Sequence, residues 1–202
     1  MESVMEKCEV LDIIISLLKG YKNISSNGDP FLHSRFKEND LYLWNTNYLL
    51  NQVIRQYNIP PERYLITKEA KALWDKITDE PITNYYYREE ITAKFDGAFV
   101  QEYKGAQKDQ YRQRTLQAGD KFIYKDIFHH EHVIPVIVII RQLKELKDEE
   151  LDYEHVYPIL ENMYICRMLK SEDREIKNKY NRPSDKDEVI KTVYEPAKVY
   201  VE

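Results

Sequence analysis

Four consecutive residues near the middle of the chain, His129, His130, Glu131 and His132, combine three imidazoles with a carboxylate. Imidazole is part neutral and part charged near pH 7, so it can accept a proton or bind a metal ion. Glu131 adds a hard oxygen ligand of the kind that magnesium and manganese prefer. Hydrolysis of a phosphodiester bond needs a base to activate water and a cation to stabilise negative charge. This segment therefore predicts a metal-dependent phosphodiesterase site.

The doublet of Glu131 and His132 supplies the metal ligand and the base from neighbouring positions. In an extended strand these side chains would point to opposite sides, unless the strand ends there. Pro135 forces a change in chain direction, which is compatible with such an end. Further along the chain, the amide of Asn162 could hold the imidazole, and Asp173 could complete the metal site.

The succession Glu131–Pro135, then Asn162, then a strand and Lys170–Asp173 resembles the HNH nucleases of the ββα-metal class. That family has an acid-His or His-His doublet before a hydrophobic-Pro step, an Asn in the connecting loop, and a His, Asn or Asp on the next helix. The resemblance covers roughly residues 120–180. It departs from the family in its long gap between doublet and Asn, in the Asp at the last position and in lacking paired cysteines.

The resemblance implies a role for each matching residue. His132 is the expected general base, Glu131 the first metal ligand, Asn162 the residue that orients the base, and Asp173 the second ligand. The implied cofactor is a divalent metal ion, Mg²⁺ or Mn²⁺, and the family favours DNA over RNA as the substrate.

Each of these residues also has a structural interpretation. His130 could replace Glu131 as a metal ligand, whereas His129 is expected to be an ordinary strand or loop residue. Asn162 is equally suited to end a helix, because Asn tolerates the left-handed backbone conformation. Asp173 equally suits the first turn of a helix, where the helix dipole favours a negative charge.

A second nuclease motif competes with the first. Asp96, Glu102 and Lys104 match the acid…Glu-x-Lys spacing of the PD-(D/E)xK nucleases, whose two carboxylates share a metal. However, Asp96-Gly97 between two alternating runs is a strong hairpin signal. Asp96 and Glu102 would then lie roughly 20 Å apart along one strand, at about 3.3 Å per residue. In that hairpin Lys104 would form a cross-strand ion pair with Glu89.

The formal net charge of −5 argues against a simple polycation that coats nucleic acid, but it allows a local basic face. Residues 104–125 carry six basic and two acidic side chains, and residues 163–182 carry six basic and three acidic ones. These segments supply the predicted nucleic-acid-binding residues, which are Lys104, Arg112, Arg114, Arg167 and Lys170.

The two cysteines, Cys8 and Cys166, form no CxxC pair, so a structural zinc knuckle is not expected and both thiols are predicted to be free. The apolar runs Val10–Leu18 and Val133–Ile140 are too short or too interrupted to span a bilayer. The first residues do not form a signal peptide. We therefore expect a soluble, cytoplasmic protein without membrane contact.

Apolar spacing predicts an α+β fold, with a helical N-terminal part and a small antiparallel sheet that carries a ββα-metal-like nuclease site. Residues 1–84 are the expected helical region and residues 85–202 the expected HNH-like nuclease domain, although the two could form one continuous domain. Residues 105–118 are expected to be a loop or a frayed helix. Predicted helices span 10–19, 40–57, 67–77, 135–146, 156–161 and 171–180, and predicted strands span 89–95, 98–104, 121–127, 164–169 and 198–201.

These patterns predict a metal-dependent endonuclease that hydrolyses phosphodiester bonds in nucleic acid. The alternatives are a PD-(D/E)xK-type nuclease and a non-enzymatic module that binds nucleic acid or protein. A nuclease that cuts both strands is often a dimer, so a homodimer is a further possibility.

Overall fold

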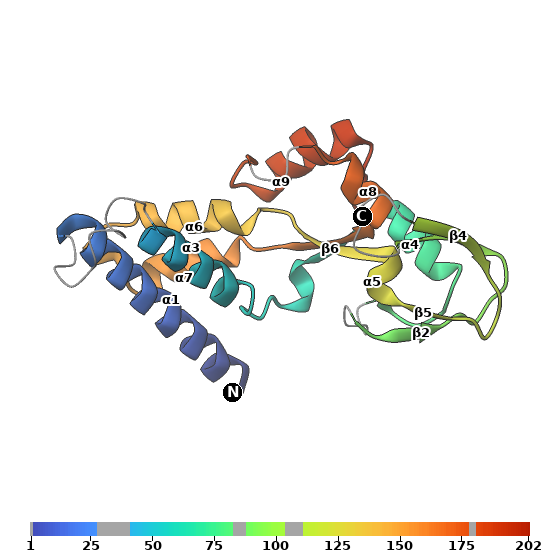
Figure 1. Cartoon of the computed structure of the whole chain (residues 1–202), viewed down its shortest axis with the longest axis horizontal. Helices are drawn as coiled ribbons and strands as arrows, with labels where there is room; N and C mark the ends of the chain where they lie inside the picture. The colour runs from blue at the N-terminus through green and yellow to red at the C-terminus, as the bar shows by residue number, and fades with distance from the viewer. Residues whose placement is uncertain (1, 28–40, 83–87, 104–110, 178–180) are drawn as a thin grey trace. The chain divides into compact units, whose positions relative to one another are not determined.

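The structure of the protein is a computed structural model that describes residues 2–27, 41–82, 88–103, 111–177 and 181–202 (Figure 1). The fold is α+β, as the apolar spacing predicts. The helices are α1 (Glu2–Asn27), α3 (Leu41–Ile54), α4 (Lys68–Asp75), α5 (Tyr124–Ile127), α6 (Val136–Glu145), α7 (Tyr153–Glu161), α8 (Lys170–Glu175) and α9 (Lys186–Val189). Shorter helical turns are η1 (Pro61–Arg63), η3 (Asp148–Glu150), the π-helical η4 (Ile190–Tyr194) and η5 (Glu195–Ala197). The strands are β1 (Tyr64–Ile66), β2 (Glu90–Thr92), β3 (Ala98–Tyr103), β4 (Tyr111–Leu116), β5 (Lys121–Ile123), β6 (Phe128–His132) and β7 (Ile165–Leu169).

The chain divides into two compact units that alternate along the sequence. The first unit consists of residues 1–59, 134–163 and 180–184, and the second of residues 60–133, 164–179 and 185–202. This division differs from the single boundary at residue 84 predicted above, because α6 and α7 belong with the N-terminal helices. None of the helices in the described ranges is long and apolar enough to cross a membrane.

The first unit is helical and packs α1, α3, α6 and α7 around an apolar core. Apolar residues recur every three or four positions in these helices, which places them on one face. Asp152 begins α7 by accepting a hydrogen bond from the backbone N–H of His155. The buried core residues include Leu11, Ile14, Leu18, Leu50, Ile54, Ile139, Ile140, Leu143, Val156 and Leu160.

The second unit contains a three-stranded sheet in the order β1-β7-β6. Strand β1 runs parallel to β7, whereas β6 runs antiparallel to it, with His130 opposite Arg167 and Glu131 opposite Cys166. Among the described strands, β6 pairs with β7 alone and is therefore an edge strand. The order β6, β7, α8 brings two antiparallel strands and the helix that follows them together.

The remaining strands of the second unit form two antiparallel pairs, β3 with β4 and β2 with β5. Their apolar faces bury Val100, Leu116 and Phe122 in one cluster with Trp74 of α4 and Phe128 of β6. The hydroxyl of Thr67 caps α4 by accepting a hydrogen bond from the N–H of Ala70. This cluster supports β6 from its N-terminal end.

The predicted hairpin around Asp96-Gly97 is wrong, because β3 pairs with β4 and not with the segment that precedes Asp96. Asp96 instead accepts a hydrogen bond from the N–H of Ala118, and the N–H of Gly97 bonds to the carbonyl of Leu116. The predicted partner of Glu89, Lys104, lies outside the described residues.

Three other predictions about local structure need correction. The loop expected over 105–118 contains strand β4, and the strand expected over 121–127 divides into β5 and α5. The final strand expected over 198–201 is reduced to an isolated bridge between Thr67 and Val201.

Candidate metal site

Strand β6 extends through both members of the Glu131-His132 doublet and ends at His132. Successive side chains in a strand alternate between the two faces of the sheet. His129 and Glu131 therefore share one face, while His130 and His132 share the other. The break that would have let neighbouring residues point to the same side does not occur between them.

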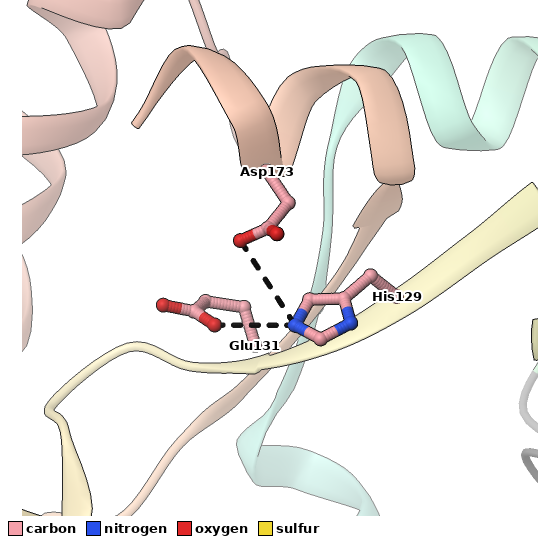
Figure 2. Close-up of side chains that lie close together, drawn as sticks. All are labelled: His129, Glu131 and Asp173. Carbon is pink, nitrogen blue, oxygen red and sulfur yellow. Dashed lines mark hydrogen bonds and ion pairs between the residues drawn. The ribbon is translucent and has the colours of Figure 1, made fainter. Parts of the chain in front are cut away.

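Three side chains of the second unit, His129, Glu131 and Asp173, converge on one place (Figure 2). The Nε2 atom of His129 lies 3.3 Å from Oε2 of Glu131 and 3.9 Å from Oδ1 of Asp173. One nitrogen or oxygen of each residue lies within 4.8 Å of the others. The side chains are 28%, 15% and 17% exposed, so solvent reaches the cluster.

This cluster fits the chemistry of a divalent metal ion. One imidazole nitrogen and two carboxylate oxygens are common donors for manganese, zinc and related ions. Donors bound at about 2.1 Å from one ion lie roughly 3.0–3.4 Å from each other. The 3.3 Å distance matches that separation, and the 3.9 Å distance to Asp173 is slightly longer.

Helix α8 positions Asp173 above β6, and its neighbour Glu172 fixes the start of that helix. The Oε2 atom of Glu172 accepts hydrogen bonds from the hydroxyl of Thr67 at 2.6 Å and from the N–H of Leu169 at 2.8 Å. Burial raises the pKa of Glu172, although these two hydrogen bonds act in the opposite direction. The contacts tie α8 to the start of α4 and to the end of β7.

The sheet beneath the cluster is apolar. Cys166 and Met168 of β7 are buried in a core with Val133 and Ile176. Cys166 is a free thiol, as predicted, and burial raises its pKa far above the ordinary range, so it stays protonated. The side chain of Cys8 lies outside the described residues.

The opposite face of β6 has a different environment. The Nε2 atom of His130 lies 3.2 Å from the hydroxyl of the fully buried Tyr124. Burial, together with the nearby charges of Arg167, His129 and His132, lowers the pKa of His130 to about 4. His130 therefore stays neutral at pH 7. It lies on the face of β6 opposite to Glu131, so it does not replace Glu131 in the cluster.

The two residues expected to carry out and support proton transfer are not among the three that converge. His132 is half-buried at the end of β6, opposite Ile165. Asn162 is exposed and ends α7 in the first unit, where its backbone N–H bonds to the carbonyls of Ile159 and Leu160. Its backbone is not left-handed, in contrast to the reason given above for an Asn at this position.

The predicted nucleic-acid-binding residues have varied environments. Arg112 and Arg114 on β4 each contact the buried carboxylate of Glu102 at 2.9 Å. Arg167 is buried on β7. Lys170 is half-buried at the start of α8, where burial lowers its pKa. Lys104 is not among the described residues.

The competing PD-(D/E)xK motif does not form a metal site in the described part of the chain. Both carboxylate oxygens of Glu102 contact arginines, and Asp96 caps a turn through the N–H of Ala118. These are structural roles, and they explain both acids without a metal.

Sequence reasoning correctly selected Glu131 and Asp173 as residues to be brought together, but it missed their third partner. His129 was interpreted as an ordinary strand or loop residue. The signal that could have identified it is strand alternation, since a residue two positions before Glu131 must lie on the same face.

Comparison of the chain with protein-family models, with curated proteins and with solved structures finds no match. The site is therefore interpreted from its own geometry.

Proposed function

We propose that this protein is a metal-dependent nuclease of the HNH type that hydrolyses phosphodiester bonds in nucleic acid, with DNA favoured over RNA. The observation that carries the proposal is the convergence of His129, Glu131 and Asp173 within 4.8 Å. Two of these residues come from an antiparallel strand pair and the third from the helix that follows it. The resemblance to HNH nucleases implies a ββα arrangement with Glu131 and Asp173 as ligands, to which the structure adds the nearby His129.

The three clustered residues would hold one divalent cation, with Mg²⁺ or Mn²⁺ preferred for the two carboxylate oxygens. When bound, such a cation would neutralise charge on the phosphate and on the leaving oxygen. The carboxylates must be ionised and His129 neutral for this role, so metal binding should weaken at acid pH.

His132 is the proposed general base. As a neutral imidazole it would take a proton from the attacking water. It lies on the face of β6 opposite to the metal ligands, but β6 is the edge strand of its sheet. A phosphate lying against that edge would be approached from both faces of the sheet, by the metal ligands from one and by His132 from the other.

The test is cleavage of plasmid DNA, single-stranded DNA and RNA in Mg²⁺, Mn²⁺ or EDTA by the unmodified protein and two histidine variants. His132→Ala should reduce cleavage by about 10²–10⁴-fold. The control is His155→Ala, which removes an exposed histidine that contacts only the neighbouring Asp152 among the described partners. Cleavage that persists in EDTA, or that His132→Ala leaves intact, would refute the proposed mechanism.

A further inference from the structure

Arg167 of β7 is a buried cation without an acidic partner in the described structure. The residue is only 6% exposed, and its Nε atom is fully buried without a hydrogen-bond partner. Buried charges are normally paired, because removing a guanidinium from water is costly. Burial lowers the pKa of Arg167, but an arginine side chain in a protein remains protonated at neutral pH. The site therefore carries an uncompensated positive charge.

The surroundings of Arg167 are aromatic and neutral. Its Cζ atom lies 4.3 Å from the centre of the Tyr64 ring. His130 stands opposite Arg167 in the sheet, and Tyr124 contacts the ring of His130 edge-on with centroids 5.3 Å apart. Tyr64 also approaches His130 edge-on, at 6.4 Å. Three strands and a helix thus hold these four side chains together in one unit.

A guanidinium that stacks on an aromatic ring still has the N–H donors around its edge for an anion. The planar fork of those donors matches two oxygens of a phosphate, and tyrosine hydroxyls and a neutral imidazole can donate further hydrogen bonds. The candidate metal site lies on the other face of the same sheet, where carboxylates would repel a phosphate that had no metal beside it. The guanidinium of Arg167 has no acidic partner among the described residues. The face that carries Arg167 is therefore the one suited to a phosphate without a bound metal ion.

We propose that Arg167, with Tyr64, Tyr124 and His130, forms a phosphate-binding site on the sheet face opposite to the cluster of His129, Glu131 and Asp173. That the phosphate belongs to a nucleic-acid strand rests on the proposed function. In that case the site holds a phosphate other than the one that is cleaved. It would position the nucleic-acid strand along the edge of β6.

The first test uses the full chain in EDTA, with inorganic phosphate titrated at constant ionic strength against a chloride reference. Phosphate should raise the melting temperature of the unmodified protein, by about 5 °C or more at 100 times the Kd. Arg167→Met should remove this shift. The matched control Arg88→Met alters an exposed arginine just before β2 and should retain it. Equal shifts in all three proteins would overturn the proposal, as would no shift in the unmodified protein.

A second measurement does not depend on Arg167→Met folding. The side-chain Nε–H signal of Arg167 in a ¹H–¹⁵N spectrum, assigned from its loss in Arg167→Lys, should move with phosphate in a saturable way. A signal that does not move would refute the site even if Arg167→Met unfolds.

A third comparison identifies the source of the phosphate and separates the two proposals. In EDTA, a single-stranded oligonucleotide should bind at least 10-fold more weakly to Arg167→Lys than to the unmodified protein, whereas the control Arg88→Lys, at an exposed arginine outside both sites, should leave its affinity unchanged. Phosphate and oligonucleotide binding without any metal-dependent cleavage would reject the nuclease and keep the phosphate site. Metal-dependent cleavage without any effect of inorganic phosphate on the melting temperature or on the Arg167 signal would reject the phosphate site and keep the nuclease. Response to inorganic phosphate without an effect of Arg167→Lys on oligonucleotide affinity would overturn the assignment to a nucleic-acid strand.

Discussion

On one side of β6, His129 and Glu131 meet an acidic residue of α8, whereas on the other side His130 and His132 share their face with Arg167 and two tyrosines. The first environment concentrates carboxylates and suits a cation. The second contains a guanidinium without an acidic partner among the described residues and suits an anion. Four consecutive residues thus face two different environments, which the alternation of the strand separates.

We expect the largest effect from substitutions in the carboxylate face, which is the side of β6 where His129 and Glu131 lie next to Asp173. Glu131→Gln and Asp173→Asn each replace an anionic oxygen donor with a neutral amide. We expect Mn²⁺ affinity to fall by at least about 100-fold, because changes to residues that merely support metal ligands already cost 10–100-fold. Cleavage should fall to background. Calorimetric Mn²⁺ titration measures the first effect, and plasmid cleavage measures the second.

Glu175→Gln is the control for these two variants, because Glu175 is an exposed carboxylate of the same helix. It should bind Mn²⁺ as the unmodified protein does. If Asp173→Asn also retains full Mn²⁺ affinity, Asp173 is not a ligand and the carboxylate face is not a metal site.

The second prediction distinguishes the role of the proposed general base, His132, from that of the proposed metal ligands. His132→Ala should reduce cleavage by about 10²–10⁴-fold, the usual contribution of a general base. It should leave Mn²⁺ affinity unchanged, because His132 lies on the face away from the ligands. The melting temperature should change little, since the side chain is only half-buried. Parallel loss of Mn²⁺ affinity would place His132 at the metal and contradict the separation of the two faces.

The α+β class, the core spacing of α6 and the convergence of Glu131 with Asp173 could be predicted from the sequence. They depend on local periodicity and on a motif with recognisable residue types. The strand pairing could not be predicted in the same way. Strand β4 has a polar sequence because Arg112 and Arg114 contact Glu102 from the neighbouring strand, a contact that local spacing does not reveal.

The same limit applies to the candidate site. Local alternation was sufficient to group His129 with Glu131, but the assumption of a strand break at the doublet obscured it. The environment of Arg167 required three strands to be placed together, two of them about 100 positions apart in sequence. No local pattern distinguishes a buried, unpaired arginine from a solvated one.

A pH effect on stability tests the environment of His130. Its pKa in the folded protein is about 4, below the ordinary value of 6.5, so the unfolded chain binds the proton more readily. Stability is therefore complete above pH 6.5 and declines as the pH falls from 6.5 towards 4. The shift corresponds to a loss of about 3 kcal/mol at most. Urea unfolding in EDTA at several pH values measures it.

His130→Phe should flatten this pH dependence, because phenylalanine fills a similar volume and does not titrate. The control His155→Ala removes a histidine whose pKa is raised by the hydrogen bond and charge of Asp152, so it should leave the decline between pH 6.5 and 4 in place. An unchanged slope in His130→Phe would show that another group causes the decline.

The smallest effect concerns Glu102, a buried carboxylate whose charge is already matched. Its side chain is 7% exposed and contacts Arg112 and Arg114, which are 55% and 29% exposed. Glu102→Gln keeps the shape but removes the charge, and the exposure of both arginines limits the loss to about 1–2 kcal/mol of unfolding free energy. Cleavage per folded molecule should stay within about 2-fold of the unmodified protein, because the hydrogen-bonded pair serves the β3–β4 hairpin and not the reaction. If Glu102→Gln instead abolishes cleavage while the protein stays folded, the PD-(D/E)xK motif becomes the better explanation, and the carboxylate face of β6 loses its proposed role.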